Sequence, residues 1–198
     1  MNDFNEALRL KSDHTETLIN RSDIYRIRNQ IDSSIADCNK AISINRNFTG
    51  AYMNRGIAYC IAGRFDEGFA DFQKVVSLDP KNSNVYCNRG NLYDMRGKLD
   101  SALADYSKAI TLKPEYSEAY YNRGKTYLRK SDYNNAINDF KSALVYNKNY
   151  PEVYYFRSQA YKAINNYQAA LQDALMAQQM GKPVQASYIA ELQRLAGY

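Results

Sequence analysis

One arginine and one aspartate recur along this chain at constant spacing, and their opposite charges could serve either a ligand or the fold. The arginines follow one another every 34 residues, and an aspartate stands sixteen residues after each of them. The pairs are Arg21 and Asp37, Arg55 and Asp71, Arg89 and Asp105, Arg123 and Asp139, and Arg157 and Asp173. A row of free guanidinium groups would recognise acidic ligands, because their planar fork matches carboxylate and phosphate oxygens. Paired inside the fold, the same arginines would fix the arrangement of the elements that carry them.

The elements that carry these charges are repeats, counted here from residues 15, 49, 83, 117 and 151. Asn-Arg-Gly occurs at 54–56, 88–90 and 122–124, and a fixed period of this length predicts a solenoid. Within each repeat, apolar residues recur at helical spacing in two runs, separated by polar breaks such as Gly63-Arg64 and Gly97-Lys98. Each repeat is therefore predicted to be an antiparallel helical hairpin, in which the arginine at position 7 faces the aspartate at position 23. We interpret the pairs as structural and keep the acidic-ligand row as the alternative.

Further positions of the repeat carry a family resemblance. Small residues stand at position 8, aromatic residues at positions 11 and 24, alanine at position 20 and proline at position 32. Examples are Gly56, Gly90 and Gly124, then Tyr25, Tyr59, Tyr93, Tyr127 and Tyr161, then Phe72, Tyr106 and Phe140, then Ala102, Ala136 and Ala170, and Pro80 and Pro114. Over nearly the whole chain this pattern resembles the tetratricopeptide repeat. The resemblance implies an all-α fold, a right-handed superhelical solenoid of antiparallel helical hairpins.

The expected organisation follows from the register of the repeats. Five repeats are predicted at 15–48, 49–82, 83–116, 117–150 and 151–184, with a partial repeat or N-terminal capping helix at 1–14 and a C-terminal capping helix at 185–198. Two repeats depart from the pattern. Gly68 replaces the alanine at position 20 of the second repeat, and Ser22 and Ser34 replace the small residues of the first. Looser packing is expected at both places.

A candidate binding surface lies on the first helix of each repeat, which the resemblance places along the inner groove of the superhelix. Position 6 holds an asparagine in four repeats, namely Asn20, Asn54, Asn88 and Asn122. An amide both donates and accepts, so such a ladder could pair with the backbone of an extended peptide. The alternative is that asparagine is simply tolerated on a hydrated surface. Phe156 breaks the row in the last repeat.

The remaining groove positions are unusually apolar for a surface. Those of the central repeats are Met53, Ile57, Cys87, Asn91, Met95, Tyr121 and Lys125, and Ile27 and Ile61 occupy further groove positions. A contiguous exposed apolar strip marks a binding site, although these side chains could equally pack between adjacent first helices. The clamp with which some family members hold chaperone tails needs basic residues where this chain has Ile19, Gly50, Met53 and Asn84. Binding of chaperone tails is therefore disfavoured.

Composition narrows the classes of function. The net charge is +5, but the signs alternate along the chain, so nucleic acid is not implied. No segment is apolar for long enough to span a bilayer, and Cys38, Cys60 and Cys87 follow neither metal-ligand nor disulfide spacing. With no signal peptide visible, a cytoplasmic location is expected. No phosphate loop, nucleophile motif or cofactor motif occurs, so we expect neither catalysis nor a cofactor.

Two classes of function remain, with a third beside them. The first is a non-catalytic interaction module that binds an extended peptide or partner segment in its groove. The second is a structural scaffold that self-assembles, which leaves homo-oligomers open. The third is that the array forms part of a longer chain belonging to an enzyme or a secretion machine. The sequence does not identify the partner protein.

Overall fold

The computed structural model describes residues 14–198, and all the regular secondary structure in this part of the chain is helical. It contains eleven α-helices and no strand, which confirms the predicted all-α repeat fold. The predicted N-terminal partial repeat or cap falls almost entirely in residues 1–13, outside the described range. None of the helices in residues 14–198 combines the length and the apolar character needed to cross a lipid bilayer.

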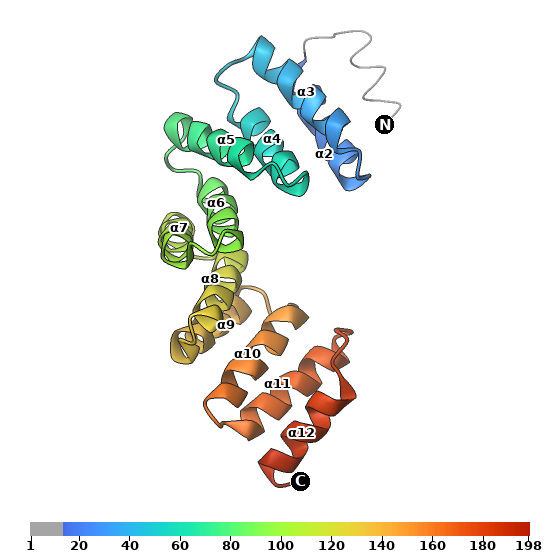
Figure 1. Ribbon diagram of the computed structural model, residues 1–198, viewed down its shortest axis with the longest axis vertical. Helices are drawn as coiled ribbons and strands as arrows, with labels where there is room; N and C mark the ends of the chain where they lie inside the picture. Colours follow the sequence, from blue (N-terminus) through green and yellow to red (C-terminus); the bar gives the residue numbers. More distant parts are fainter. Residues whose placement is uncertain (1–13) are drawn as a thin grey trace. The chain divides into compact units, whose positions relative to one another are not determined.

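The chain divides into two compact units, residues 1–92 and 93–198, with the boundary inside helix α6. The described helices of the first unit are α2 (Thr15–Ile27), α3 (Ile31–Ile44), α4 (Thr49–Ile61), α5 (Phe65–Leu78) and most of α6 (Ser83–Met95). Helices α2 and α3 pack as one hairpin and α4 and α5 as the next (Figure 1). The first helices, α2 and α4, also contact each other, so part of each first helix is covered by its neighbour.

The second unit is built in the same way. Its helices are the end of α6 together with α7 (Leu99–Leu112), α8 (Ser117–Arg129), α9 (Tyr133–Tyr146), α10 (Pro151–Ala163), α11 (Tyr167–Gln179) and α12 (Ala186–Ala196). Helices α8 and α9 form one hairpin and α10 and α11 another, while α12 lies against α11 at the C-terminal end (Figure 1). Leu192 of α12 is fully buried, whereas Gln193 and Arg194 are exposed. Helix α12 therefore has one apolar side that packs inward and one polar side in solvent, and its role as a cap stays a prediction.

The turn inside each hairpin has the same backbone conformation in all five repeats. Position 15 has a positive φ angle at Asn29 (58°), Gly63 (74°), Gly97 (73°), Ser131 (59°) and Asn165 (61°). Glycine adopts this left-handed conformation without cost, and asparagine tolerates it better than most residues. The polar breaks of the sequence therefore mark the point at which the chain reverses direction.

Side-chain volumes at positions 8 and 24 complement each other within a hairpin. A Cβ atom on Gly56 would lie 2.7 Å from the ring of Phe72, and one on Gly124 would lie 2.7 Å from the ring of Phe140. In the first repeat, position 8 holds a serine, Ser22, and position 24 a small residue, Cys38. Both of these side chains are fully buried. A larger residue at one position thus accompanies a smaller one at the other, which keeps the interior filled.

The expectation of loose packing at Gly68 is wrong. A Cβ atom there would lie 2.8 Å from Cys60 Sγ and 3.0 Å from the carbonyl oxygen of Gly56. The thiol of Cys60 and the backbone of α4 occupy the space that an alanine methyl group fills in the last three repeats. In the first repeat, Ser34 is also buried, although its hydroxyl has no hydrogen-bond partner within residues 14–198.

Candidate peptide-binding surface

The structure brings four of the five arginine–aspartate pairs together, each within one hairpin. The shortest nitrogen–oxygen distances are 2.6 Å for Arg21 and Asp37, 2.7 Å for Arg55 and Asp71, 2.7 Å for Arg123 and Asp139, and 2.7 Å for Arg157 and Asp173. In every one of the four, Nε and Nη2 donate to separate carboxylate oxygens. In these four pairs, the two parallel hydrogen bonds fix the position and the rotation of one helix of the hairpin relative to the other. Arg89 and Asp105 belong to different units, and their pairing stays a prediction.

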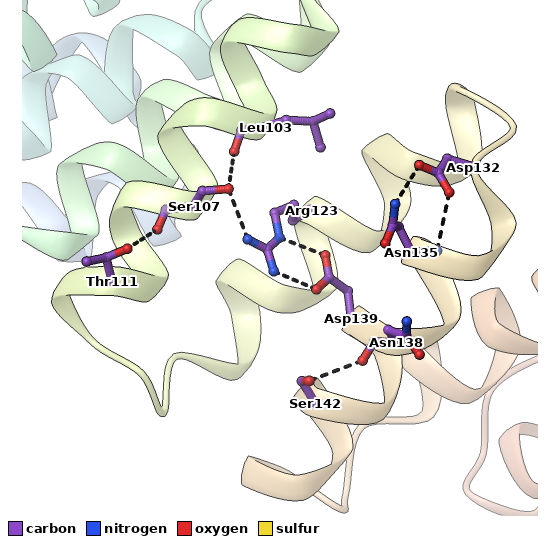
Figure 2. Close-up of polar contacts among 9 residues, drawn as sticks. All are labelled: Leu103, Ser107, Thr111, Arg123, Asp132, Asn135, Asn138, Asp139 and Ser142. Atoms are coloured by element: carbon purple, nitrogen blue, oxygen red, sulfur yellow. Dashed lines mark hydrogen bonds and ion pairs between the residues drawn. The ribbon is translucent and has the colours of Figure 1, made fainter.

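Two of these arginines also reach the preceding repeat. Arg123 Nη1 donates to Ser107 Oγ of α7 at 2.9 Å, and Arg55 Nη1 donates to Asn39 Oδ1 of α3 at 2.6 Å. Figure 2 shows Arg123 between Ser107 on one side and Asp139 on the other. The guanidinium therefore connects its own hairpin with its neighbour. The acidic-ligand interpretation receives no support, because the donors of these arginines point at protein groups.

Burial and pairing act in opposite directions on the protonation of Arg123 and Asp139. Burial raises the pKa of the Asp139 carboxyl above its ordinary value, and the hydrogen bonds and charge of Arg123 oppose this without cancelling it. Burial lowers the pKa of the Arg123 guanidinium, but the hydrogen bonds and charge of Asp139 outweigh that effect and raise it. The pair is ionised at neutral pH, since both carboxylate oxygens accept a hydrogen bond.

The asparagines of the first unit are not all free on a surface. Asn20 is exposed, but the Asn54 amide nitrogen lies 3.3 Å from Ser22 Oγ and 3.5 Å from the Ile19 carbonyl oxygen, both on the preceding first helix. The amide nitrogen of Asn88 lies 3.4 Å from Met53 Sδ. In the second unit, Asn122 is half-buried on α8. The Oδ1 atoms of Asn54 and Asn88 accept no hydrogen bond within residues 14–198, so each amide keeps an acceptor for a ligand, and Asn88 also keeps one of its two N–H groups.

The apolar floor divides into buried and exposed side chains. Cys87 is only 1% exposed, so its assignment to a ligand-contacting floor is wrong. Ile19, at the same repeat position, is also buried, in a cluster that contains Ala51 of the next first helix. This position therefore faces the neighbouring repeat. Met53, Ile57 and Asn91 are half-buried.

The last position of the first helices remains open to solvent. Ile27 is 73% exposed and Ile61 is 51% exposed in the first unit. In the second unit, Met95 is 63% exposed. Three apolar side chains at one repeat position are thus left uncovered within the described part of the chain.

In the second unit, α8 and α10 border an open pocket of about 330 Å³. Its lining consists of Lys125, Leu128, Arg129, Phe156 and Gln159. Lys125 was predicted as a groove residue. Tyr121, also predicted, lies half-buried beside the pocket, with its ring centroid 5.8 Å from that of Phe156. The pKa of the Tyr121 hydroxyl is raised to about 12, mainly by burial and to a smaller extent by the nearby charge of Glu152.

The sequence pattern placed Lys125, Leu128, Arg129 and Gln159 at groove positions, but it did not assign Phe156 to a binding site. The replacement of the recurrent asparagine by Phe156 was visible in the sequence and carried the relevant signal. It places a large ring where the other repeats have a small amide.

The comparison with known proteins identifies the repeat. Models of the tetratricopeptide repeat match residues 15–48, 50–82, 72–104 and 117–150, and a model of the TPR repeat matches residues 95–131. The chain belongs to the tetratricopeptide repeat family. The tetratricopeptide repeat is a protein-interaction module. No curated protein sequence matches the chain at a significant level.

Several solved tetratricopeptide repeat structures resemble this one. The pilF protein of Pseudomonas aeruginosa is 21% identical, with a TM-score of 0.83 over 92% of this chain and 82% of its own. MamA is 21% identical, with a TM-score of 0.71 over 80% of this chain and 93% of its own. YrrB, described as a tetratricopeptide repeat protein with an unusual peptide-binding site, is 17% identical, with a TM-score of 0.68 over 96% of this chain and 97% of its own. At these identities the likeness establishes the fold alone.

Proposed function

We propose that this protein is a non-catalytic interaction module that binds an extended segment of a partner protein on its first helices. Each unit has its own candidate surface: the open side of α2, α4 and the beginning of α6 in the first unit, and of α8 and α10 in the second. The observation that carries the proposal is the exposure of Ile27 and Ile61, which are equivalent residues of neighbouring helices. YrrB, a protein of the same fold, is described as having a peptide-binding site, which supports this class of function.

A partner that covers Ile27 and Ile61 would remove their apolar surface from water, which favours binding. Full burial of one isoleucine side chain contributes roughly 1.5–3 kcal/mol, so two such residues could supply much of the affinity of a short peptide. The open Oδ1 atoms of Asn54 and Asn88 would accept hydrogen bonds from the backbone N–H groups of that peptide. Apolar contacts would then select side chains, while the amides hold the backbone regardless of sequence.

The test begins with selection of binding peptides from a random display library against the folded protein. Affinities of the selected peptides are then measured for the parent chain and for the double variant Ile27→Ser with Ile61→Ser. Each change removes an exposed apolar group, so the fold should be retained. We expect binding to weaken at least about tenfold, equivalent to about 1.4 kcal/mol.

Ile44→Ser is the matched control. Ile44 lies on α3, a second helix, and is 43% exposed, so the change has the same chemistry on a different surface. It should leave peptide affinity unchanged. Failure to enrich any peptide, or equal loss of affinity in the control and the double variant, would contradict the proposed function.

Self-assembly is the second candidate, and a different set of exposed apolar side chains favours it. The second helices of the second unit expose Val145 and Tyr146 on α9, and Leu175 and Met176 on α11. Two copies could bury these side chains against each other. Sedimentation equilibrium distinguishes the candidates, since an interaction module of one chain has a mass of 22.7 kDa. A larger mass that falls to this value in Val145→Ser would favour self-assembly.

A further inference from the structure

A row of aromatic rings runs through the second unit beside the pocket. The ring centroid of Tyr121 on α8 lies 4.9 Å from that of Tyr150 and 5.8 Å from that of Phe156. Phe156 and Tyr155 of α10 follow at 5.6 Å, and Tyr155 and Tyr188 of α12 at 6.2 Å. The rings contact one another across three helices. They form a continuous apolar and polarisable surface.

Three lysines lie over this row of rings. Lys125 Nζ is 5.2 Å from the ring centroid of Tyr121 and 5.4 Å from that of Phe156. Lys182 Nζ is 5.6 Å from the centroid of Tyr155. Lys162 Nζ is 5.2 Å from the centroid of Tyr188 and also forms an ion pair with Glu191. Cation–π attraction of this kind holds an ammonium group in place above a ring.

Two of these ammonium groups have no carboxylate partner in residues 14–198. Lys162 is neutralised by Glu191, and Arg129, the other cation of the pocket, is neutralised by Asp94. No ion pair within the described range includes Lys125 or Lys182. Two further acids act on the rings: the charge of Glu152 acts on Tyr121, and that of Asp173, which is paired with Arg157, acts on Tyr188. Lys125 thus offers a positioned positive charge at the rim of the pocket.

We infer that the pocket of α8 and α10 binds a partner segment in which an aspartate or glutamate stands next to an aromatic or leucine side chain. This inference rests on the proposed function and adds the chemistry of the ligand. The apolar side chain would enter the pocket against Phe156 and Leu128. The carboxylate would pair with Lys125, and Gln159 would pair with the peptide backbone. A volume of about 330 Å³ is at the small end of ligand pockets and suits one large side chain.

The charges of the site favour a peptide over a nucleic acid. Nucleic-acid binding depends on many cations that contact successive phosphates. Here Arg129 and Lys162 are already paired with acidic side chains. The cations left along the rings are few and suit one or two carboxylates.

Three pools of short fluorescent peptides test the inference by anisotropy. The first contains Asp or Glu beside Phe or Leu, the second replaces the acids by Asn or Gln, and the third replaces Phe or Leu by Ala. Only the first pool should bind well. Lys125→Met keeps an apolar stem but removes the charge, and it should weaken binding of the first pool by about tenfold. Lys148→Met removes an exposed lysine from the loop before α10 and should have no effect.

The outcomes separate this inference from the function on which it rests. Equal binding of acidic and neutral pools, or no effect of Lys125→Met, overturns the acidic ligand while leaving a peptide-binding protein. Binding of a single-stranded oligonucleotide that competes with the first pool overturns it as well. If no pool binds and library selection also yields no peptide, the proposed function fails too. Phe156→Ala should weaken binding of the first pool, because the ring that the apolar side chain would contact is lost. If Phe156→Ala does not fold, the Lys125→Met result decides.

Discussion

Removing one partner of a buried ion pair should cost far more than removing both. In the pair of Arg123 and Asp139, the arginine side chain is 19% exposed and the aspartate side chain 7%. The change Arg123→Leu leaves the Asp139 carboxylate buried without its counter-charge. We expect the free energy of unfolding to fall by about 3–5 kcal/mol. Asp139→Leu should cost less, because the guanidinium is more exposed and keeps its bond to Ser107.

The double variant Arg123→Leu with Asp139→Leu should be much milder than the sum of the two single variants. No buried charge remains in it, and the leucines fill part of the vacated volume. Urea unfolding followed by far-ultraviolet circular dichroism measures the three variants and the parent. The interaction free energy from this cycle should reach several kcal/mol, above the range of about 0.5–3 kcal/mol that neighbouring residues usually show.

The pH dependence of Arg123→Leu provides a second readout of the same reasoning. Without its partner, the buried Asp139 carboxyl has a pKa further above the unfolded value. Stability that depends on the protonated carboxyl is present below the unfolded pKa and is lost as pH rises through the folded pKa. The variant should therefore be least destabilised in acid and most destabilised near neutrality. Additive single effects, or a destabilisation that does not change with pH, would refute a buried structural pair.

Three further predictions concern packing, the turns and the buried thiol. Gly124→Ala should destabilise by about 1–3 kcal/mol in thermal unfolding, since its Cβ would lie 2.7 Å from the Phe140 ring. Gly50→Ala, whose Cβ would meet ordinary contact at 3.6 Å, should be neutral or stabilising, and equal losses would contradict this packing. Ser131→Gly should stabilise by about 1 kcal/mol, because Ser131 has a φ angle of 59°; an unchanged melting temperature would argue against strain there. Burial raises the pKa of Cys38 to about 11, so its contribution to stability should be lost as pH rises from about 8.5 to 11, by up to about 3 kcal/mol. Urea titrations should show a smaller loss in Cys38→Ala, and an identical loss would exclude Cys38 as the cause.

The repeated elements of the fold could be predicted from the sequence, because each of them occurs several times. A single helix boundary is hard to place, but a break at position 15 recurs at Gly63, Gly97, Ser131 and Asn165. Hairpin geometry then places position 7 beside position 23, and the structure has Arg123 and Asp139 in contact. Such reasoning requires only the distance from the turn, which a regular helix fixes.

The candidate site was harder to predict, because the repeat period alone does not show which side of a first helix is covered by the first helix of the next repeat. Cys87 was assigned to the groove but is buried, and the donor of Asn54 is used by the preceding helix. The link from Arg123 to Ser107 was also missed. It depends on how one repeat stacks on the next, and no pattern within a single repeat contains that information. The pocket at Phe156 arises from one departure from the repeat, which periodic reasoning averages away.

The most direct test of the account is to map a bound peptide onto the helices by NMR. Backbone amide shifts of the labelled protein are followed during titration with a peptide selected from the library. Within each hairpin, the largest changes should fall on the first helix, on α4 rather than α5 and on α10 rather than α11. Changes concentrated on α5, α9 and α11 would place the partner on the second helices and contradict the proposed binding surface.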